Sequence, residues 1–193
     1  LQVLLLLVTV YALGSESKFG TSGEWLQAAH GRIGVAVLGK LLPYTFLFAM
    51  MGMLANAVFF GWMQLPLSCS LWTLNVVTVL FLCATQALAL TLYAVFPVMS
   101  LVISVVSMIG SLGATLSGVT FPVAFMDTPV YAASFLFSVR HFMEVVQSLL
   151  YLEGSLADEW MNLMVLLLFL LLPVLLLPRL KKSLITRRYE AFE

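Results

Sequence analysis

Long apolar runs separated by short polar segments dominate the chain, and this pattern predicts several membrane-spanning helices. Residues 41–61, 71–95 and 99–120 are each long enough to cross a bilayer, because a spanning helix needs about 20 apolar residues. A fourth run covers residues 161–178. The opening run, residues 1–13, is shorter, so we interpret it as the end of a span and expect at least one further segment upstream of it.

The first polar segment, residues 14–40, is rich in glycine and is expected to lie in water. Trp25 and Leu26 stand together within it, and we expect a short amphipathic helix around them whose apolar side chains are exposed. The positions that turn the chain into this helix or cap it are Gly20, Thr21, Ser22 and Gly23. The segment is either an anchor at the membrane surface or a lever on which another protein acts.

Residues 121–160 differ from the spans because prolines and charges interrupt their apolar sequence. We expect two short helices that lie at, or dip into, one face of the membrane, with polar residues 179–193 forming a tail after the last span. Arg140 and Glu144 are four residues apart and should pair on one of these helices. The pair is either an outer gate or a self-neutralising pair at the interface, and we prefer the second interpretation.

Lysine and arginine are distributed unevenly between the two sides of the predicted spans. Alternation of the spans places residues 14–40, the turn at Pro97 and residues 179–193 on one side, and residues 121–160 on the other. The first side holds Lys18, Arg32, Lys40, Arg179, Lys181, Lys182, Arg187 and Arg188, whereas the second holds only Arg140. Positive residues favour the cytoplasmic side, so residues 14–40 and the tail should face the cytoplasm.

Small residues recur along one face of the span at 99–120. They are Ser100, Ser104, Ser107, Ser111, Ala114 and Gly118. Small side chains allow helix backbones to approach closely in lipid, so this face either packs within the subunit or forms a subunit interface or translocation path. Polar residues are also scattered along the span at 71–95, at Asn75, Thr78, Gln86 and Thr91. We favour hydrogen bonding between neighbouring helices over a polar cavity for these four.

The composition agrees with a membrane protein and excludes several functions. The chain is 62% hydrophobic and 9% charged, whereas a soluble domain has about 25% charged residues. Its net charge is zero, which gives no basic field for nucleic acid. No ionisable residue lies centrally in a clear span, which argues that any energy source for transport is outside the chain. We expect no disulfide between Cys69 and Cys83 and find no metal-ligand spacing.

Two groups of residues resemble the type-2 ATP-binding-cassette exporter permeases. The first group is Glu16, Lys18, Gly20, Thr21 and Leu26, followed by Gly39, Lys40, Leu41, Leu42, Pro43 and Tyr44. The second is Ser117, Gly118, Phe121, Pro122, Met126 and Pro129, followed by Arg140, His141, Phe142 and Gly154. The family usually has a proline shortly before the aromatic of the second segment, where this chain has Ser138.

This resemblance, which covers nearly the whole chain, implies an all-α polytopic bundle with short re-entrant helices before the last span. It implies a non-catalytic permease subunit that pairs with a second subunit in the membrane lipid of a bacterial plasma membrane. ATP and Mg²⁺ would be bound by a separate cytoplasmic ATPase, and this chain would bind no cofactor. Coupling to that ATPase would fall to Glu16, Gly20, Thr21, Glu24, Trp25 and Leu26. The outer re-entrant segment would hold Phe121, Pro122, Pro129, Arg140 and Glu144.

A different class of function stays open beside the exporter permease, namely a polytopic membrane enzyme or a membrane assembly scaffold. A membrane enzyme would be expected to gather His, Asp or Glu at one membrane depth, and the sequence has no such cluster. The transported molecule does not follow from the sequence, although apolar walls favour a hydrophobic or amphipathic small molecule.

Overall fold

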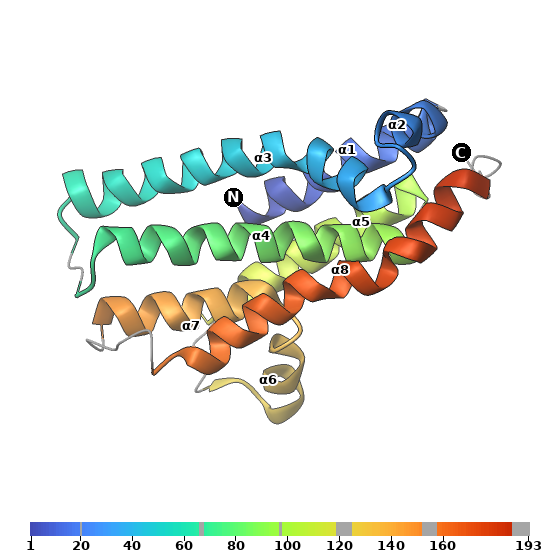
Figure 1. Cartoon of the computed structure of the whole chain (residues 1–193). Coiled ribbons are helices and arrows are strands. Elements are labelled where there is room, and N and C mark those ends of the chain that lie inside the picture. Colours follow the sequence, from blue (N-terminus) through green and yellow to red (C-terminus); the bar gives the residue numbers. More distant parts are fainter. Residues whose placement is uncertain (20, 66–67, 97, 119–124, 152–157, 187–193) are drawn as a thin grey trace.

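The computed structural model describes residues 1–19, 21–65, 68–96, 98–118, 125–151 and 158–186, and within these ranges the chain contains helices and no strands. Figure 1 shows them as one bundle of long helices with shorter helices at its ends. The helices are α1 (Gln2–Lys18), α2 (Ser22–Ala28), α3 (Ile33–Asn56), α4 (Leu71–Val95), α5 (Met99–Thr115), α6 (Thr128–Ser134), α7 (Ser138–Tyr151) and α8 (Trp160–Thr186). A π-helical segment, Ala57–Trp62, continues α3.

Three helices are long and apolar enough to cross a membrane, which confirms the all-α membrane bundle. They cover Ile33–Trp62, Leu71–Val95 and Trp160–Leu180. Two further apolar helices, α1 and α5, are shorter. Within the span of α4, 61% of the residues are buried inside the bundle, against 17% in α8. The central helix is therefore α4, while much of α8 is left to face lipid.

The helix bounds differ from the expected ones at three places. The first helix continues past residue 13 to Lys18, and α3 begins at Ile33 rather than at residue 41. The expected aqueous loop at 14–40 is thus mostly helical, because residues 33–39 are apolar and extend the following span. The expected span at 99–120 ends at Thr115, since Gly118 has a φ of 88°, which a right-handed helix does not allow.

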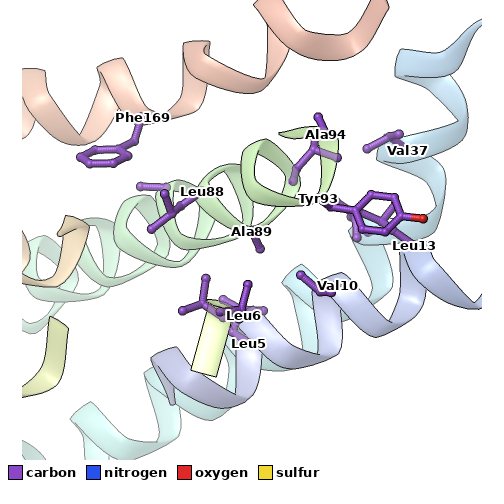
Figure 2. Close-up of a cluster of buried hydrophobic side chains, with 14 of the residues drawn as sticks. Leu5, Leu6, Val10, Leu13, Val37, Leu88, Ala89, Tyr93, Ala94 and Phe169 are labelled. Carbon is purple, nitrogen blue, oxygen red and sulfur yellow. The ribbon is translucent and has the colours of Figure 1, made fainter. Parts of the chain in front are cut away.

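The hydrophobic core is built around α4, as Figure 2 shows. Ala89 and Tyr93 of α4 lie toward side chains of α1, including Leu6 and Val10, whereas Leu88 lies on the side of Phe169 in α8. Further core residues come from α3 and α8. Close approach of α3 and α4 depends on Gly52, where an added Cβ would lie only 3.0 Å from the Thr78 side chain.

Hydrogen bonds between side chains also join α3 to α4. The amide of Asn56 donates to Asn75 Oδ1 at 2.9 Å and to Thr78 Oγ1 at 3.0 Å. A second contact joins Thr45 Oγ1 to Gln86 Oε1 at 2.6 Å. These contacts confirm the preferred interpretation of Asn75, Thr78 and Gln86 as helix–helix partners. Among the described residues, the hydroxyl of Thr91 bonds within α4, to the Ala87 carbonyl at 2.8 Å.

Candidate functional site

The junction of α1, α2 and α3 brings together residues that are distant in the sequence. Helix α1 ends at Lys18 and α3 begins at Ile33, so α2 lies between their two ends. Figure 1 shows α2 at the same end of the bundle as the C-terminal end of α8. The Nζ atom of Lys40 forms an ion pair with Glu16 Oε1, and Thr21 Oγ1 donates a hydrogen bond to Glu16 Oε2. One carboxylate therefore connects all three elements.

This carboxylate is partly hydrated. The side chains of Lys40 and Glu16 keep 18% and 19% of their surface exposed. Burial alone would raise the pKa of Glu16, but the hydrogen bonds from Lys40 and Thr21 and the charge of Lys40 outweigh it and lower that pKa. Glu16 is consequently ionised at neutral pH and holds its two partners as a charged acceptor.

The two apolar residues of α2 are not the exposed pair that the sequence suggested. Leu26 is only 7% exposed and belongs to the hydrophobic core. Trp25 is half-buried, packs against that core, and lies under the ammonium of Lys40, which is 5.4 Å from the centre of its ring. The surface that α2 offers to a partner consists instead of Gly23, Glu24, Gln27 and Ala28.

The ends of α2 explain how it is held in place. Thr21 occupies the N-cap position, but its φ of −87° and ψ of 1° are not the extended backbone of a capping residue, and it makes no capping hydrogen bond to the described part of α2. Its hydroxyl donates to Glu16 instead. Glu24 lies in the first turn, where its negative charge suits the helix dipole. At the other end, the Gly31 N–H donates to the Leu26 carbonyl and the His30 N–H to the Gln27 carbonyl, both at 2.9 Å. This is a Schellman motif. Gly20 lies outside the described residues.

The small-residue face of α5 is largely uncovered by the rest of the chain. Ser100, Ser104, Ser111 and Ala114 are exposed, and Ser107 is half-buried. The buried side of α5 is formed by other residues, which are Met99, Val102, Val106, Gly110 and Gly113. Packing against the described residues of this chain therefore does not account for the small face. Gly118, which was expected on it, lies beyond the end of α5.

The hydroxyls on this face need no external partner. Ser104 Oγ donates to the Ser100 carbonyl at 3.1 Å, Ser107 Oγ to the Ile103 carbonyl at 2.8 Å, and Ser111 Oγ to the Met108 carbonyl at 2.9 Å. The face is therefore small in volume, and the hydroxyl protons of Ser104, Ser107 and Ser111 are already used within the helix. Such a surface suits close contact with another helix in lipid.

The expected pair of Arg140 and Glu144 is present on α7. Arg140 is 1% exposed, and its Nη2 donates to Glu144 Oε1 at 2.6 Å. Its Nη1 donates to Ser134 Oγ of α6 at 2.6 Å. The guanidinium also lies 4.7 Å from the ring centre of Tyr131 and 4.6 Å from that of Phe135. Arg140 is thus the residue that fastens α6 to α7.

A second polar chain, next to this cluster, fastens α7 to the start of α8. His141 is 2% exposed and has Nδ1 2.8 Å from Asn162 Oδ1 and Nε2 3.1 Å from the Phe135 carbonyl. Asn162 Nδ2 donates to Glu159 Oε2 at 2.7 Å. We call Arg140, Glu144, His141, Asn162 and Glu159 the α6–α7–α8 cluster. Pro129 stands in the first turn of α6, and Phe121 and Pro122 lie outside the described residues.

Sequence reasoning missed several members of these sites. Lys40 was counted among the cytoplasmic positive residues and as part of a motif, but not as the charged partner of Glu16 that it is. The sequence did hold a signal for this pair, because Lys40 and Glu16 carry opposite charges and were expected on the same side of the membrane. His141 and Asn162 are 21 residues apart in the chain, and only the return of α8 against α7 brings them together.

Comparison with known proteins finds no relative: no protein-family model, no curated protein and no solved structure matches the chain. The fold and hydropathy identify a helical membrane protein. Its activity is therefore inferred from the α1–α2–α3 junction, the exposed face of α5 and the α6–α7–α8 cluster.

Proposed function

We propose that this chain is the membrane permease subunit of an ATP-driven exporter, with ATP and Mg²⁺ bound by a separate cytoplasmic ATPase. The observation that supports this most is the shared carboxylate at the α1–α2–α3 junction. Glu16, Thr21 and Lys40 carry much of the sequence resemblance to type-2 ATP-binding-cassette permeases, and they meet in one hydrogen-bonded cluster that fastens α2 to two longer helices.

Such a junction suits the transmission of force from a partner. A load on the exposed side of α2 would reach α1 and α3 through the Glu16 carboxylate and through the buried Leu26. The docking surface is accordingly Glu24, Gln27 and the small residues beside them, while Trp25 and Leu26 serve as the internal support of the helix. Within this coupling element, the exposed residues of α2 would bind the ATPase and the buried ones would hold the helix in place.

The test is co-purification of the ATPase with the full-length subunit, together with ATP-dependent transport in vesicles. Ala28→Arg places a bulky charge on the exposed side of α2 and should reduce ATPase association at least tenfold without changing membrane insertion. Met63→Arg, at an exposed position far from α2, is the matched control and should retain association. Full association and transport by Ala28→Arg would contradict docking on α2. Copurification of no ATPase with the wild-type subunit would favour the membrane enzyme or scaffold.

The proposal also requires a defined orientation. Cysteines introduced at Ser17 and Ser183 should react with a membrane-impermeant maleimide only from the cytoplasmic side, and one at Ser155 only from outside. The opposite reactivity at any of these positions would place α2 on the wrong side for a cytoplasmic ATPase.

A second permease subunit is part of the proposal, and the small face of α5 supports it. The hydroxyls of its exposed Ser104 and Ser111 donate within their own helix, so two copies of the face can approach closely there without leaving these donors unpaired. Ser104→Cys should give a disulfide-linked dimer in membranes, whereas Leu175→Cys on the lipid-facing side of α8 should not. Equal cross-linking at both positions would indicate random collision.

A further inference from the structure

A cavity of about 400 Å³ lies between α3, α4 and α8. Lys40 of the junction is not among its lining residues, and neither is any residue of α5. One stripe of each helix lines it, within residues 34–45, 83–90 and 170–177. Nearly all of these residues are apolar, the exceptions being Thr45, Gln86 and the weakly polar Cys83. The volume is within the range of about 300–1,000 Å³ that is typical of small-molecule sites.

The cavity opens sideways, toward the surface that the spanning helices present to lipid. Leu38 and Leu42 of α3 line it and are 67% and 66% exposed, and Val174 of α8 lines it and is 56% exposed. The stripe on α3 is about 17 Å long at 1.5 Å per residue. Lys40, whose ion pair with Glu16 is partly hydrated, lies midway along this stripe, so the half from Leu41 to Thr45 is the part nearest the centre of the span. The exposed lining residues give a molecule dissolved in the membrane access to the cavity from the side.

Gln86 is the one residue of the cavity wall with an unsatisfied buried amide. Its side chain is 6% exposed, Oε1 accepts from Thr45 Oγ1, and Nε2 has no partner among the residues that the structure describes. The Nε2 atom itself is buried, so a molecule in the cavity reaches it by a rotation of the amide. The Thr45 hydroxyl is also 3.0 Å from the Leu41 carbonyl, and it has only one proton to give. If that proton goes to Leu41, a rotated Gln86 amide donates to Thr45 and leaves Oε1 open instead. In either case one polar atom of Gln86 stays unpaired.

An unpaired polar atom at this depth is unfavourable, because the hydrocarbon core has no water to satisfy it. The methylene groups of a lipid chain fill the cavity without providing a hydrogen bond. A hydroxyl group both donates and accepts, so it satisfies Gln86 in either orientation of the amide. The chemistry of the wall thus selects an apolar molecule with a hydroxyl group over a plain hydrocarbon.

We propose that the α3–α4–α8 cavity binds a small hydrophobic molecule that enters from the membrane and whose hydroxyl group hydrogen-bonds to Gln86. The proposal concerns these three helices alone and holds whether or not the chain is an exporter subunit. Cys83 lies inside the cavity and can be enlarged to fill it, and Thr91, whose hydroxyl donates to the Ala87 carbonyl of its own helix, provides a control position outside it.

Photolabelling of the full-length protein in membranes tests this directly. The probes are an aryl diazirine with a phenolic hydroxyl and the same compound without the hydroxyl, with adducts mapped by mass spectrometry. The phenolic probe should be enriched at residues 34–45, 83–90 and 170–177, and Gln86→Leu should reduce that labelling about fivefold to tenfold, as for loss of one hydrogen bond. Thr91→Val should leave it unchanged. Cys83→Trp, which fills the cavity, should abolish labelling by both probes.

A competition experiment on the wild-type protein tests the proposal without relying on substituted proteins. In the wild-type protein, an excess of an alkylphenol without a diazirine should suppress labelling of the cavity, and the matching alkylbenzene should suppress it at least fivefold less effectively. The proposal is overturned if Gln86→Leu labels as strongly as the wild type, or if the two competitors act equally. It is also overturned if adducts are no denser in the cavity than at lipid-facing residues outside these ranges, such as Met164 and Leu168.

Discussion

The α1–α2–α3 junction and the α6–α7–α8 cluster are both fastened by an ion pair, but the two pairs differ in their contact with water. Glu16 and Lys40 at the junction are each almost one-fifth exposed. In the cluster Arg140 is 1% exposed, while Glu144 is 29% exposed. The junction pair joins residues 24 positions apart in the chain, whereas the cluster pair joins neighbours on one helix.

The difference has a mechanical meaning. Water can replace the partner of either residue at the junction, so that pair is separated at a cost of about 1 kcal/mol or less. Arg140 has no such replacement, and its separation from Glu144 leaves a buried charge. We therefore expect the junction to be able to change its arrangement during function, whereas the α6–α7–α8 cluster should keep one arrangement throughout.

The largest effect that this comparison predicts is for Glu144→Ala. Removal of the carboxylate leaves Arg140 buried without a negative partner, so the free energy of unfolding should fall by about 3 kcal/mol or more. The measurement is unfolding in mixed detergent micelles, followed by tryptophan fluorescence. Glu144→Gln keeps an acceptor oxygen and should lose less. Arg140→Met should also cost less than Glu144→Ala, because the remaining Glu144 can hydrate. A larger loss of stability for Arg140→Met than for Glu144→Ala would contradict the proposed difference between the buried Arg140–Glu144 pair and the hydrated Glu16–Lys40 pair.

His141→Phe should have the second largest effect. It keeps a ring of similar size but leaves the Phe135 carbonyl and Asn162 Oδ1 without their partner, at a cost of about 2 kcal/mol. The same unfolding measurement applies. His141→Gln can still donate to one of the two acceptors and should recover part of the loss. A His141→Phe protein as stable as the wild type would show that the cluster is not a fixed unit.

Features of the fold that depend on one stretch of sequence could be predicted, whereas features that depend on contacts between distant residues could not. Hydropathy over about 20 residues revealed the spans at Leu71–Val95 and Trp160–Leu180, because lipid imposes that length on any helix that crosses it. It misplaced the start of α3, since glycines and Lys40 suggested a loop where an apolar stretch continues the helix. The pairing of Lys40 with Glu16 is the physical reason that a charge is tolerated there.

The candidate sites divide in the same way. The Arg140–Glu144 pair follows from helical spacing, which is a local property, and it was foreseen. The burial of Leu26 was not, because whether an apolar residue on a short helix faces water or core depends on the helices beneath it. The cavity at Gln86 needed three helices from separate parts of the chain, so no single stretch of sequence indicated it.

A smaller effect is expected at the junction, and it should depend on pH. The pKa of Glu16 in the folded protein lies below its ordinary value of 4.5, so its contribution to stability is present above pH 4.5 and is lost as the pH falls through the folded pKa. Lys40→Met should therefore lower stability by about 1 kcal/mol or less at pH 7 and approach the wild type at acid pH. Unfolding measured across this range checks it. A difference that grows toward low pH would contradict the assignment.

The smallest effect should be a gain in stability at the end of α2. His30 has a φ of 54°, a left-handed conformation that the Schellman motif requires and that glycine adopts more readily than histidine. His30→Gly should relieve that strain while also loosening the unfolded chain, for a net gain of about 0.5 kcal/mol. Gly31, with a φ of 72°, is the matched opposite case, and Gly31→Ala should lose stability. Calorimetry of both variants separates them. His30 and Glu144 belong to separate regions, so the effects of the two substitutions should add. In the double variant, His30→Gly should leave the stability loss caused by Glu144→Ala unchanged.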